Sequence, residues 1–253
     1  MPESLHDFFD EIEAPDRSLV VLNRNSPDPV RGLLDSLLDG QTVSISDVES
    51  STEEEDVVAL VENGAVLARS TLTELLESVL LINSDLYKTG LIELGEVELP
   101  DVLMGLDEVP FRVLGYPQSH KEKLLLIVIS RVIERIAAET NAGTLRSSFQ
   151  RLSRIRDERG TYEVYETLGR SGVDVHVYGI GDADLTELSV SPHAGDSFPY
   201  RRSWFVVFVP PPGSDLDHAA LVAIEAEPTV WDGFWTFRPD LVARIETYIA
   251  DRV

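Results

Sequence analysis

The sequence predicts an α+β fold in which a mixed, largely antiparallel central sheet is flanked by helices. Three observations favour it. A long apolar helical pattern occupies residues 119–141, an alternating strand pattern occupies Val173–Tyr178, and three further strand patterns follow at residues 204–209, 220–226 and 230–237. Consecutive strands joined by short links are typical of an antiparallel meander.

The long helix is the expected centre of the fold. At its start, the Ser119 hydroxyl can accept from the Glu122 backbone N–H while the Glu122 carboxylate accepts from that of Ser119, which is a capping box. Apolar residues then recur at three- and four-residue steps as far as Ala137, which predicts a mostly buried helix of about five turns. Asn141 and Gly143 tolerate the left-handed conformation that ends a helix.

The N-terminal half predicts short helices and strands in alternation. In order, these are a helix over Ser4–Glu13, a buried strand at Leu19–Leu22, a helix over Pro29–Leu38, a brief strand at Thr42–Ile45, a solvated acidic loop at Ser46–Asp56, a hairpin of Val57–Val61 and Ala65–Ala68, and a helix over Leu72–Leu81. Asn63-Gly64 suits the positive φ of a tight hairpin turn.

The remaining elements surround the long helix. They are a short helix near Val102–Leu106, strands at Phe111–Leu114 and Thr144–Gln150, a helix over Thr161–Leu168, an edge strand at Leu188–Val190 and a terminal helix opened by Pro239. Phe205–Val209 is apolar throughout, so we expect it at the sheet centre, covered on both faces. A break near Pro117 suggests an N-terminal α/β subdomain (1–117) and a second unit (118–253), which we expect to form one compact body.

Charge is the strongest global feature. The 253 residues include 45 acidic and 21 basic side chains, for a net charge of −24. Because high salt screens such self-repulsion, we expect adaptation to a saline cytosol. An acidic protein with a cationic partner is the alternative. The negative field argues against nucleic-acid binding, which needs a cationic surface.

The sequence also limits location and chemistry. The absence of cysteine excludes disulfides, thiolate catalysis and cysteine-based metal sites. Neither a signal peptide nor a membrane-spanning run is present, so we expect a cytoplasmic chain with no membrane partner. The five histidines lack metal-site spacing, and no complete nucleotide-binding glycine motif occurs, so no metal or cofactor is expected.

A local excess of arginine stands out. Arg146, Arg151, Arg154, Arg156 and Arg159 fall within one short stretch of a chain poor in cations. These guanidinium groups either pair with the acidic surface or form a face that recognises anions or a partner, using the bidentate geometry of arginine.

Several sequence blocks together resemble the DICT sensory domain, especially its haloarchaeal members. They are Ile133-Glu134, Gly143–Leu145, Phe149-Gln150-Arg151-Leu152-Ser153, Val173–Gly179, Arg202–Val207, and Gly233–Phe237 with Pro239, and the block at 149–153 is the most specific. The resemblance is clearest from His120 to the C-terminus. It implies a cytoplasmic sensory domain of the kind found with diguanylate cyclases and two-component systems, and it implies no catalytic residues and no particular ligand.

We therefore expect a non-catalytic sensory or regulatory domain that binds a small ligand or a signalling protein of the histidine kinase or response regulator type. The candidate ligand-binding residues are Phe149, Gln150, Arg151, Tyr178, Arg202, Trp204, Glu225 and Trp235. An enzyme of unrecognised type, with acidic residues in a cleft near Phe149, Gln150 and Glu225, is the alternative. A pure interaction module without a ligand is a third possibility.

Overall fold

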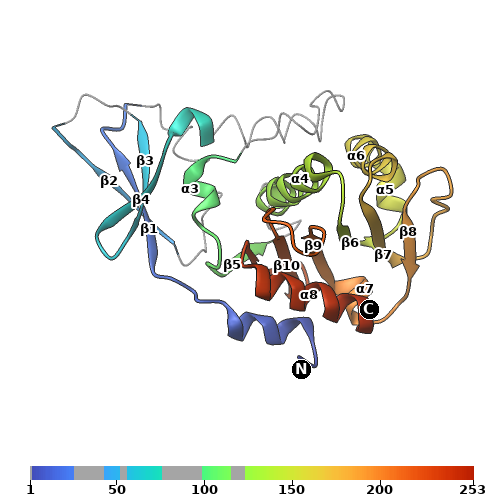
Figure 1. Cartoon of the computed structure of the whole chain (residues 1–253). Helices are drawn as coiled ribbons and strands as arrows, with labels where there is room; N and C mark the ends of the chain where they lie inside the picture. The colour runs from blue at the N-terminus through green and yellow to red at the C-terminus, as the bar shows by residue number, and fades with distance from the viewer. Residues whose placement is uncertain (1, 26–42, 52–55, 76–98, 115–122) are drawn as a thin grey trace.

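The strands form two sheets, one of four strands and one of seven (Figure 1). The structure is a computed structural model that describes residues 2–25, 43–51, 56–75, 99–114 and 123–253. Helices accompany the seven-stranded sheet on both faces, and its strand pairs are mostly antiparallel. The predicted α+β class with a mixed, largely antiparallel sheet is confirmed.

The four-stranded sheet is N-terminal. It contains β1 (Arg17–Leu22), β2 (Ser44–Val48), β3 (Val57–Glu62) and β4 (Ala65–Thr71), in the order β2-β1-β3-β4. Asn63 and Gly64 have φ angles of 51° and 79°, which confirms the predicted hairpin turn. The acidic loop predicted from Ser46 begins later, because Ser46, Asp47 and Val48 pair with β1.

The seven-stranded sheet has the order β5-β11-β10-β9-β6-β7-β8. Its strands are β5 (Phe111–Leu114), β6 (Thr144–Arg151), β7 (Asp174–Ile180), β8 (Ser191–Ala194), β9 (Ser203–Val209), β10 (Ala219–Glu227) and β11 (Val230–Thr236). Strands β6, β7 and β8 run parallel to one another, and the other pairs are antiparallel. As predicted, β9 lies at the centre and β9, β10 and β11 form a meander.

Helices cover both faces of this sheet (Figure 1). On one face lie α4 (Lys123–Thr140), α5 (Ser153–Asp157) and α6 (Arg159–Arg170). On the other lie the 3-10 helix η1 (Leu5–Glu11), α7 (Phe198–Arg202) and α8 (Pro239–Arg252). The short helix α3 (Asp101–Met104) contacts β3 and β4 of the other sheet. We call the two sides of the seven-stranded sheet the α4 face and the α8 face.

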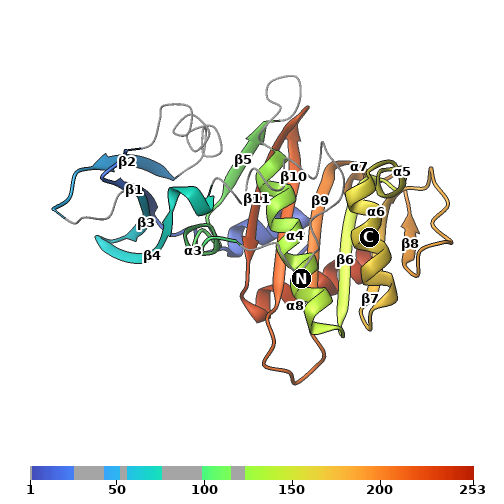
Figure 2. The same cartoon turned by 90° about the horizontal axis from the view of Figure 1, so that it is seen from above.

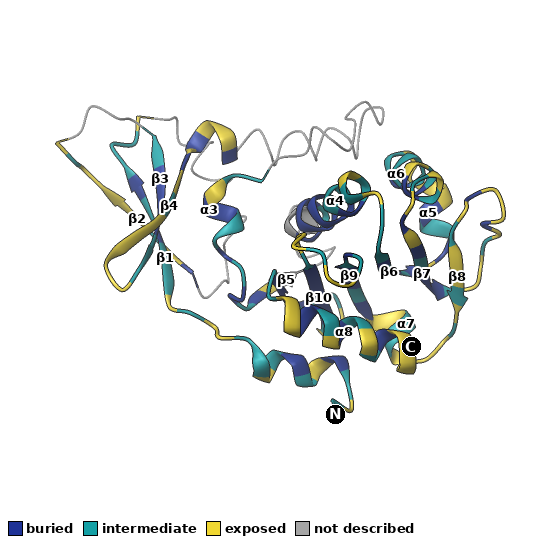
Figure 3. Cartoon of the chain, viewed as in Figure 1, coloured by how far each residue is buried: buried dark blue, intermediate teal, exposed yellow. Residues whose placement is uncertain are grey.

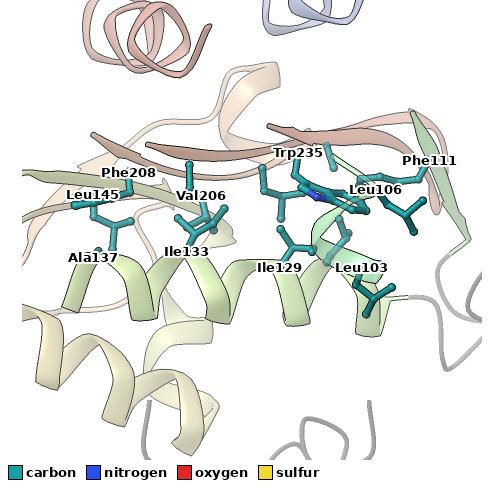
Figure 4. Close-up of a cluster of buried hydrophobic side chains, with 14 of the residues drawn as sticks. Leu103, Leu106, Phe111, Ile129, Ile133, Ala137, Leu145, Val206, Phe208 and Trp235 are labelled. Atoms are coloured by element: carbon teal, nitrogen blue, oxygen red, sulfur yellow. The ribbon is translucent and has the colours of Figure 1, made fainter. Parts of the chain in front are cut away.

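The core follows the buried side of α4. Ile129, Ile133 and Ala137 point from the helix toward the sheet, where they meet Val206 and Phe208 (Figure 4). The same cluster of buried side chains includes Leu19 and Leu60 of the four-stranded sheet, so one core connects the two sheets. Figure 3 shows the buried positions along the inner side of α4 and through the sheet. Packing of an amphipathic helix against strands is the main source of its stability.

The end of α4 is fixed by residues in the left-handed region. Asn141 and Gly143 have φ angles of 53° and 97°, as their residue types predicted. The Asn141 side-chain oxygen also accepts a hydrogen bond of 2.9 Å from the backbone N–H of Gly172, in the turn between α6 and β7. The helix end is therefore joined to the connection that follows α6.

The predicted edge strand at Leu188–Val190 is wrong. The backbone N–H of Leu188 donates to Leu185 and that of Val190 donates to Leu188, both at 2.9 Å, so these groups are used in local turns. The edge strand is instead β8, which starts three residues later, and Pro192 is tolerated there because an edge strand leaves some donors unused.

Some predictions lie wholly or partly outside the described residues. They are the capping box at Ser119 and Glu122, the helix over Pro29–Leu38, and the helix over Leu72–Leu81 beyond residue 75. Thr71 does cap the start of the last one, since its hydroxyl accepts from the Glu74 N–H while the Glu74 carboxylate accepts from the Thr71 N–H. The proposed boundary at residue 117 stays a prediction, and β5 belongs to the second sheet. No helix in the described ranges has the length and apolar content needed to cross a bilayer.

Candidate functional site

Polar side chains gather at the end of the seven-stranded sheet where β6 stops. Strand β6 pairs in parallel with β7 and antiparallel with β9, so the carboxyl ends of β6 and β7 lie beside the start of β9. Figure 2 shows α5, which follows β6, and α7, which precedes β9, at this same end. In open α/β sheets, ligands commonly bind in a crevice beyond the carboxyl ends of parallel strands.

We call this region the β6/β9 end. It comprises Phe149, Gln150, Arg151, Arg154, Asp182, Arg202, Ser203, Trp204 and Glu225. Phe149, Gln150 and Arg151 come from β6, Arg154 comes from α5, and Asp182 lies shortly after the end of β7. The others come from α7 (Arg202), β9 (Ser203 and Trp204) and β10 (Glu225).

Gln150 holds the β6/β9 end together. Its φ of 56° lies in the left-handed region, and the pairing of β6 with β7 shifts register between Ser148 and Arg151. The buried Gln150 amide donates from Nε2 to the Ser203 carbonyl at 2.7 Å and accepts at Oε1 from Arg154 Nη1 at 2.6 Å. A non-glycine residue at positive φ costs on the order of 1 kcal/mol and is common at binding sites.

Two ion pairs border Gln150. Arg151 Nε donates to Asp182 at 2.7 Å, and the backbone N–H of Ser153 donates to the same carboxylate at 2.9 Å. The Ser153 N–H, followed by the Arg151 guanidinium, lowers the pKa of Asp182. On the opposite side, Arg202 lies 3.6 Å from Glu225, whose Oε1 also accepts from the Thr229 backbone N–H at 3.0 Å. The pair formed by Arg151 is therefore tight, whereas the pair formed by Arg202 is loose.

Aromatic side chains connect this end to α4. The Trp204 indole donates from Nε1 to the Ser130 hydroxyl of α4 at 3.1 Å. Phe149 packs edge-on against Tyr165 of α6, with ring centroids 5.0 Å apart. The Tyr165 hydroxyl in turn donates to the buried Glu134 carboxylate of α4 at 2.9 Å. Changes at the β6/β9 end can thus reach α4 by two short paths.

The structure brings together six of the eight predicted site residues. Phe149, Gln150, Arg151, Arg202, Trp204 and Glu225 lie at the β6/β9 end. The other two lie elsewhere: Tyr178 packs among residues of the α8 face, and Trp235 is buried in the core on the α4 face, where it packs on Phe111 at 5.6 Å.

The site selected from sequence did not include Arg154, Ser203 and Asp182, which the structure adds. Ser203 contributes its backbone carbonyl, which accepts from both Ser148 and Gln150. A backbone acceptor has no residue-type signal, so sequence patterns could not identify it. Asp182 lies two residues after the end of β7 and could have been noticed as an acid that follows a predicted strand and Gly181.

Three arginines of the stretch pair with carboxylates, which was one of the two predicted roles; the other role, recognition of an anion or a partner, stays a prediction. Arg146 pairs with Glu246, Arg151 with Asp182, and Arg159 with Glu163, each at 2.7 Å. Within the described residues, Arg154 donates to the Gln150 amide, and Arg156 donates to the Asp184 backbone carbonyl at 3.3 Å while its charge lowers the pKa of the Asp184 carboxylate.

A second polar cluster surrounds Tyr178 on the α8 face. His176 Nδ1 lies 2.9 Å from His193 Nε2, and His176 Nε2 lies 3.0 Å from the Asp174 carboxylate. The His193 ring stacks on Tyr178 with centroids 4.4 Å apart, and Arg146 donates to the Tyr178 hydroxyl at 2.7 Å. In the part of the chain that the structure describes, no group of three or more histidine, aspartate or glutamate side chains is arranged to hold a metal ion.

The histidine pair predicts a pH dependence of stability. Burial, then His176 and Arg146, lower the pKa of His193, against a smaller opposite effect of Asp174. Protonation of His193 therefore favours the unfolded chain, whose histidine has a pKa of about 6.5. The contribution is full above that pH and declines as pH falls through the lowered folded pKa. We expect melting temperatures to show a smaller loss between pH 7.5 and 5.5 in His193→Phe, which keeps the ring stacked on Tyr178; an equal loss in both proteins would contradict this.

The fold and site define a two-sheet α+β protein with a polar site at a strand-direction change and a helix that links this site to the core. Residues 106–227 match the family model of DICT, described as a sensory domain in diguanylate cyclases and two-component systems. The matched stretch is just under half of the chain, begins at the end of α3 and ends with β10. No curated protein and no solved structure matches the chain.

Proposed function

We propose that this protein is a non-catalytic sensory or regulatory domain that binds a small ligand at the β6/β9 end. The family match carries the proposal, because residues 106–227 contain β6, β7, β9 and β10 and every residue of the β6/β9 end. Gln150 supports it, since its buried amide is hydrogen-bonded at both ends and its strained backbone lies at the carboxyl end of a parallel strand, where ligands commonly bind.

The proposed signal passes through α4. A ligand that moves Trp204 would disturb its hydrogen bond to Ser130, and one that moves Phe149 would act on Tyr165 and so on Glu134. Both paths end on the helix that fills the core. A signalling protein of the histidine kinase or response regulator type would then respond to the new position or stability of α4.

The proposed setting is the cytoplasm of a salt-rich cell. The net charge of −24 supports a salt-rich cell, because a molar electrolyte shortens the Debye length to about 3 Å and suppresses repulsion between surface carboxylates. The match to the DICT family model supports the cytoplasmic location, because the resemblance to DICT domains implies a cytoplasmic sensory domain.

Ligand retention tests the proposed function. Native mass spectrometry of the chain purified from its source cells is expected to show a bound small molecule. Gln150→Gly is expected to lose it, because glycine keeps the left-handed backbone while the side chain that joins Ser203 to Arg154 is removed. Asn63→Gly, at another left-handed position in the β3–β4 hairpin, is the matched control and should retain the molecule. Equal retention by both variants would contradict the proposed site.

A further inference from the structure

The β6/β9 end is locally rich in cations although the chain is strongly acidic. Arginines at positions 151, 154, 156, 201 and 202 lie on β6, α5 and α7, which meet at this end of the sheet (Figure 2). They are five of only 21 basic residues in the chain, against 45 acidic ones. Such a concentration is unexpected if arginines serve only to neutralise the acidic surface, because that surface extends along the whole chain.

Three of these arginines donate hydrogen bonds only to neutral acceptors among the described residues, and the charge of Arg156 also lowers the pKa of the Asp184 carboxylate. Arg154 donates to an amide oxygen, and Arg156 and Arg201 donate to the backbone carbonyls of Asp184 and Asp196. Arg156 and Arg201 are exposed, so water solvates their charge. Arg154 is half-buried, and a partly desolvated cation without an anionic partner is unfavourable.

Gln150 fixes the position of the Arg154 guanidinium. Because the Gln150 Nε2 is committed to the Ser203 carbonyl at 2.7 Å, its Oε1 faces Arg154 and accepts from Nη1 at 2.6 Å. That bond uses one of the five N–H groups of the guanidinium, and the planar fork remains suited to a carboxylate or a phosphate. A neutral glutamine orients the cation without satisfying its charge.

Arg202 is a second arginine beside the Gln150–Ser203 hydrogen bond. It directly precedes Ser203, and its guanidinium is only loosely paired with Glu225, at 3.6 Å. The Arg202 side chain is about half exposed, at 51%. It can therefore turn toward an incoming anion without breaking a short ion pair.

We propose that Arg154, oriented by Gln150, binds the anionic group of the ligand that the β6/β9 end receives, with Arg202 as a second cationic contact. The anionic group is a carboxylate or a phosphate. This inference rests on the proposed sensory function and adds the chemical class of the ligand. It also explains why the half-buried Arg154 pairs with none of the carboxylates among the described residues, although the chain is rich in acidic side chains.

Calorimetric titration with inorganic phosphate and with acetate, at an ionic strength held constant with KCl, tests the proposal on the full chain. Wild type is expected to bind at least one of the two anions at a single saturable site, and the anion preferred indicates phosphate or carboxylate as the ligand group. Arg154→Gln should weaken binding about tenfold to hundredfold, the loss expected for a charge-assisted hydrogen bond. The affinity of Arg154→Lys should lie between those of wild type and Arg154→Gln, because lysine keeps the charge but lacks the planar fork of the guanidinium.

Arg156→Gln is the matched control. It removes the same charge two residues away on α5, from a side chain that is exposed, and should change the affinity less than twofold. Equal weakening by Arg154→Gln and Arg156→Gln would show general electrostatic attraction only and would overturn the proposal. Saturable binding with the same affinity in wild type and Arg154→Gln would overturn it as well. So would the absence of saturable binding of either anion by folded wild type. Circular dichroism confirms that each variant is folded.

The two proposals fail separately. A neutral molecule retained in native mass spectrometry would sustain the sensory function and overturn the anion site. Conversely, phosphate or acetate binding that depends on Arg154, with no retained molecule in protein from source cells, would sustain the anion site and count against a resident small-molecule ligand.

Discussion

Replacing Glu134 by alanine is expected to lower the free energy of unfolding by about 3 kcal/mol, because it breaks a buried charge pair from one side. Glu134 is only 3% exposed and accepts from Arg131 at 2.7 Å and from the Tyr165 hydroxyl at 2.9 Å. Burial, followed by the nearby Glu134 charge, raises the pKa of Tyr165, so this hydroxyl stays a donor. The substitution removes the acceptor that the largely buried Arg131 guanidinium and the buried Tyr165 hydroxyl share, while Arg131 keeps its hydrogen bond to the Thr161 hydroxyl.

Glu139→Ala is the matched control for this prediction. Glu139 lies on the same helix, is 60% exposed, and stands 3.9 Å from Arg135, so its loss should cost at most about 0.5 kcal/mol. Urea denaturation of both variants measures the difference. A double change of Glu134 and Arg131 to Leu and Met should recover much of the stability, since it removes both charges. A cost for Glu134→Ala as small as that for Glu139→Ala would contradict the buried network.

Gly143→Ala is expected to lower stability by about 3 kcal/mol and the melting temperature by roughly 6 to 12 °C. Gly143 has a φ of 97°, which disfavours any residue with a Cβ. The added Cβ would also collide with the Val209 carbonyl oxygen and would lie 2.9 Å from the Pro210 Cα, where β9 ends. These backbone atoms belong to the last residue of the central strand and to the residue after it, so they cannot move freely.

Gly64→Ala separates backbone strain from collision. Gly64 has a φ of 79°, and a Cβ there would meet nothing within 4 Å. Its alanine variant should therefore lose only about 1 kcal/mol, the cost of the left-handed conformation alone. Differential scanning calorimetry of both variants gives the comparison, and a Gly143→Ala loss no larger than that of Gly64→Ala would mean that the α4–β6 junction is more adaptable than the structure indicates.

The sequence predicted the structure best where the residue types within a single helix, strand or turn are enough to specify it. The three- and four-residue spacing of Ile129, Ile133 and Ala137 predicts the buried side of α4, and the apolar run of β9 predicts a strand covered on both faces. Asn63-Gly64 predicts the hairpin because tight primed turns require positive φ. Each of these predictions depends on contacts that the residue types themselves select.

The candidate site was harder to predict because it depends on how separate elements meet. The left-handed Gln150 follows from a register shift between β6 and β7, which no local pattern encodes. Arg146 pairs with Glu246, one hundred residues away, whereas Arg154, in the same stretch, donates to the Gln150 amide within the described part of the chain. Tyr178 and Trp204 were both candidate ligand-binding residues, yet the two belong to opposite faces of the sheet, and only the strand pairing could have separated them.

Ligand retention by the intact protein tests the central claim most directly. A mass above that of the bare chain in native spectra of wild type and Asn63→Gly, absent from Gln150→Gly, is what a sensory site at the β6/β9 end predicts. Bare-chain masses in all three proteins, or an identical bound molecule in all three, would contradict a ligand-binding role for this end of the sheet.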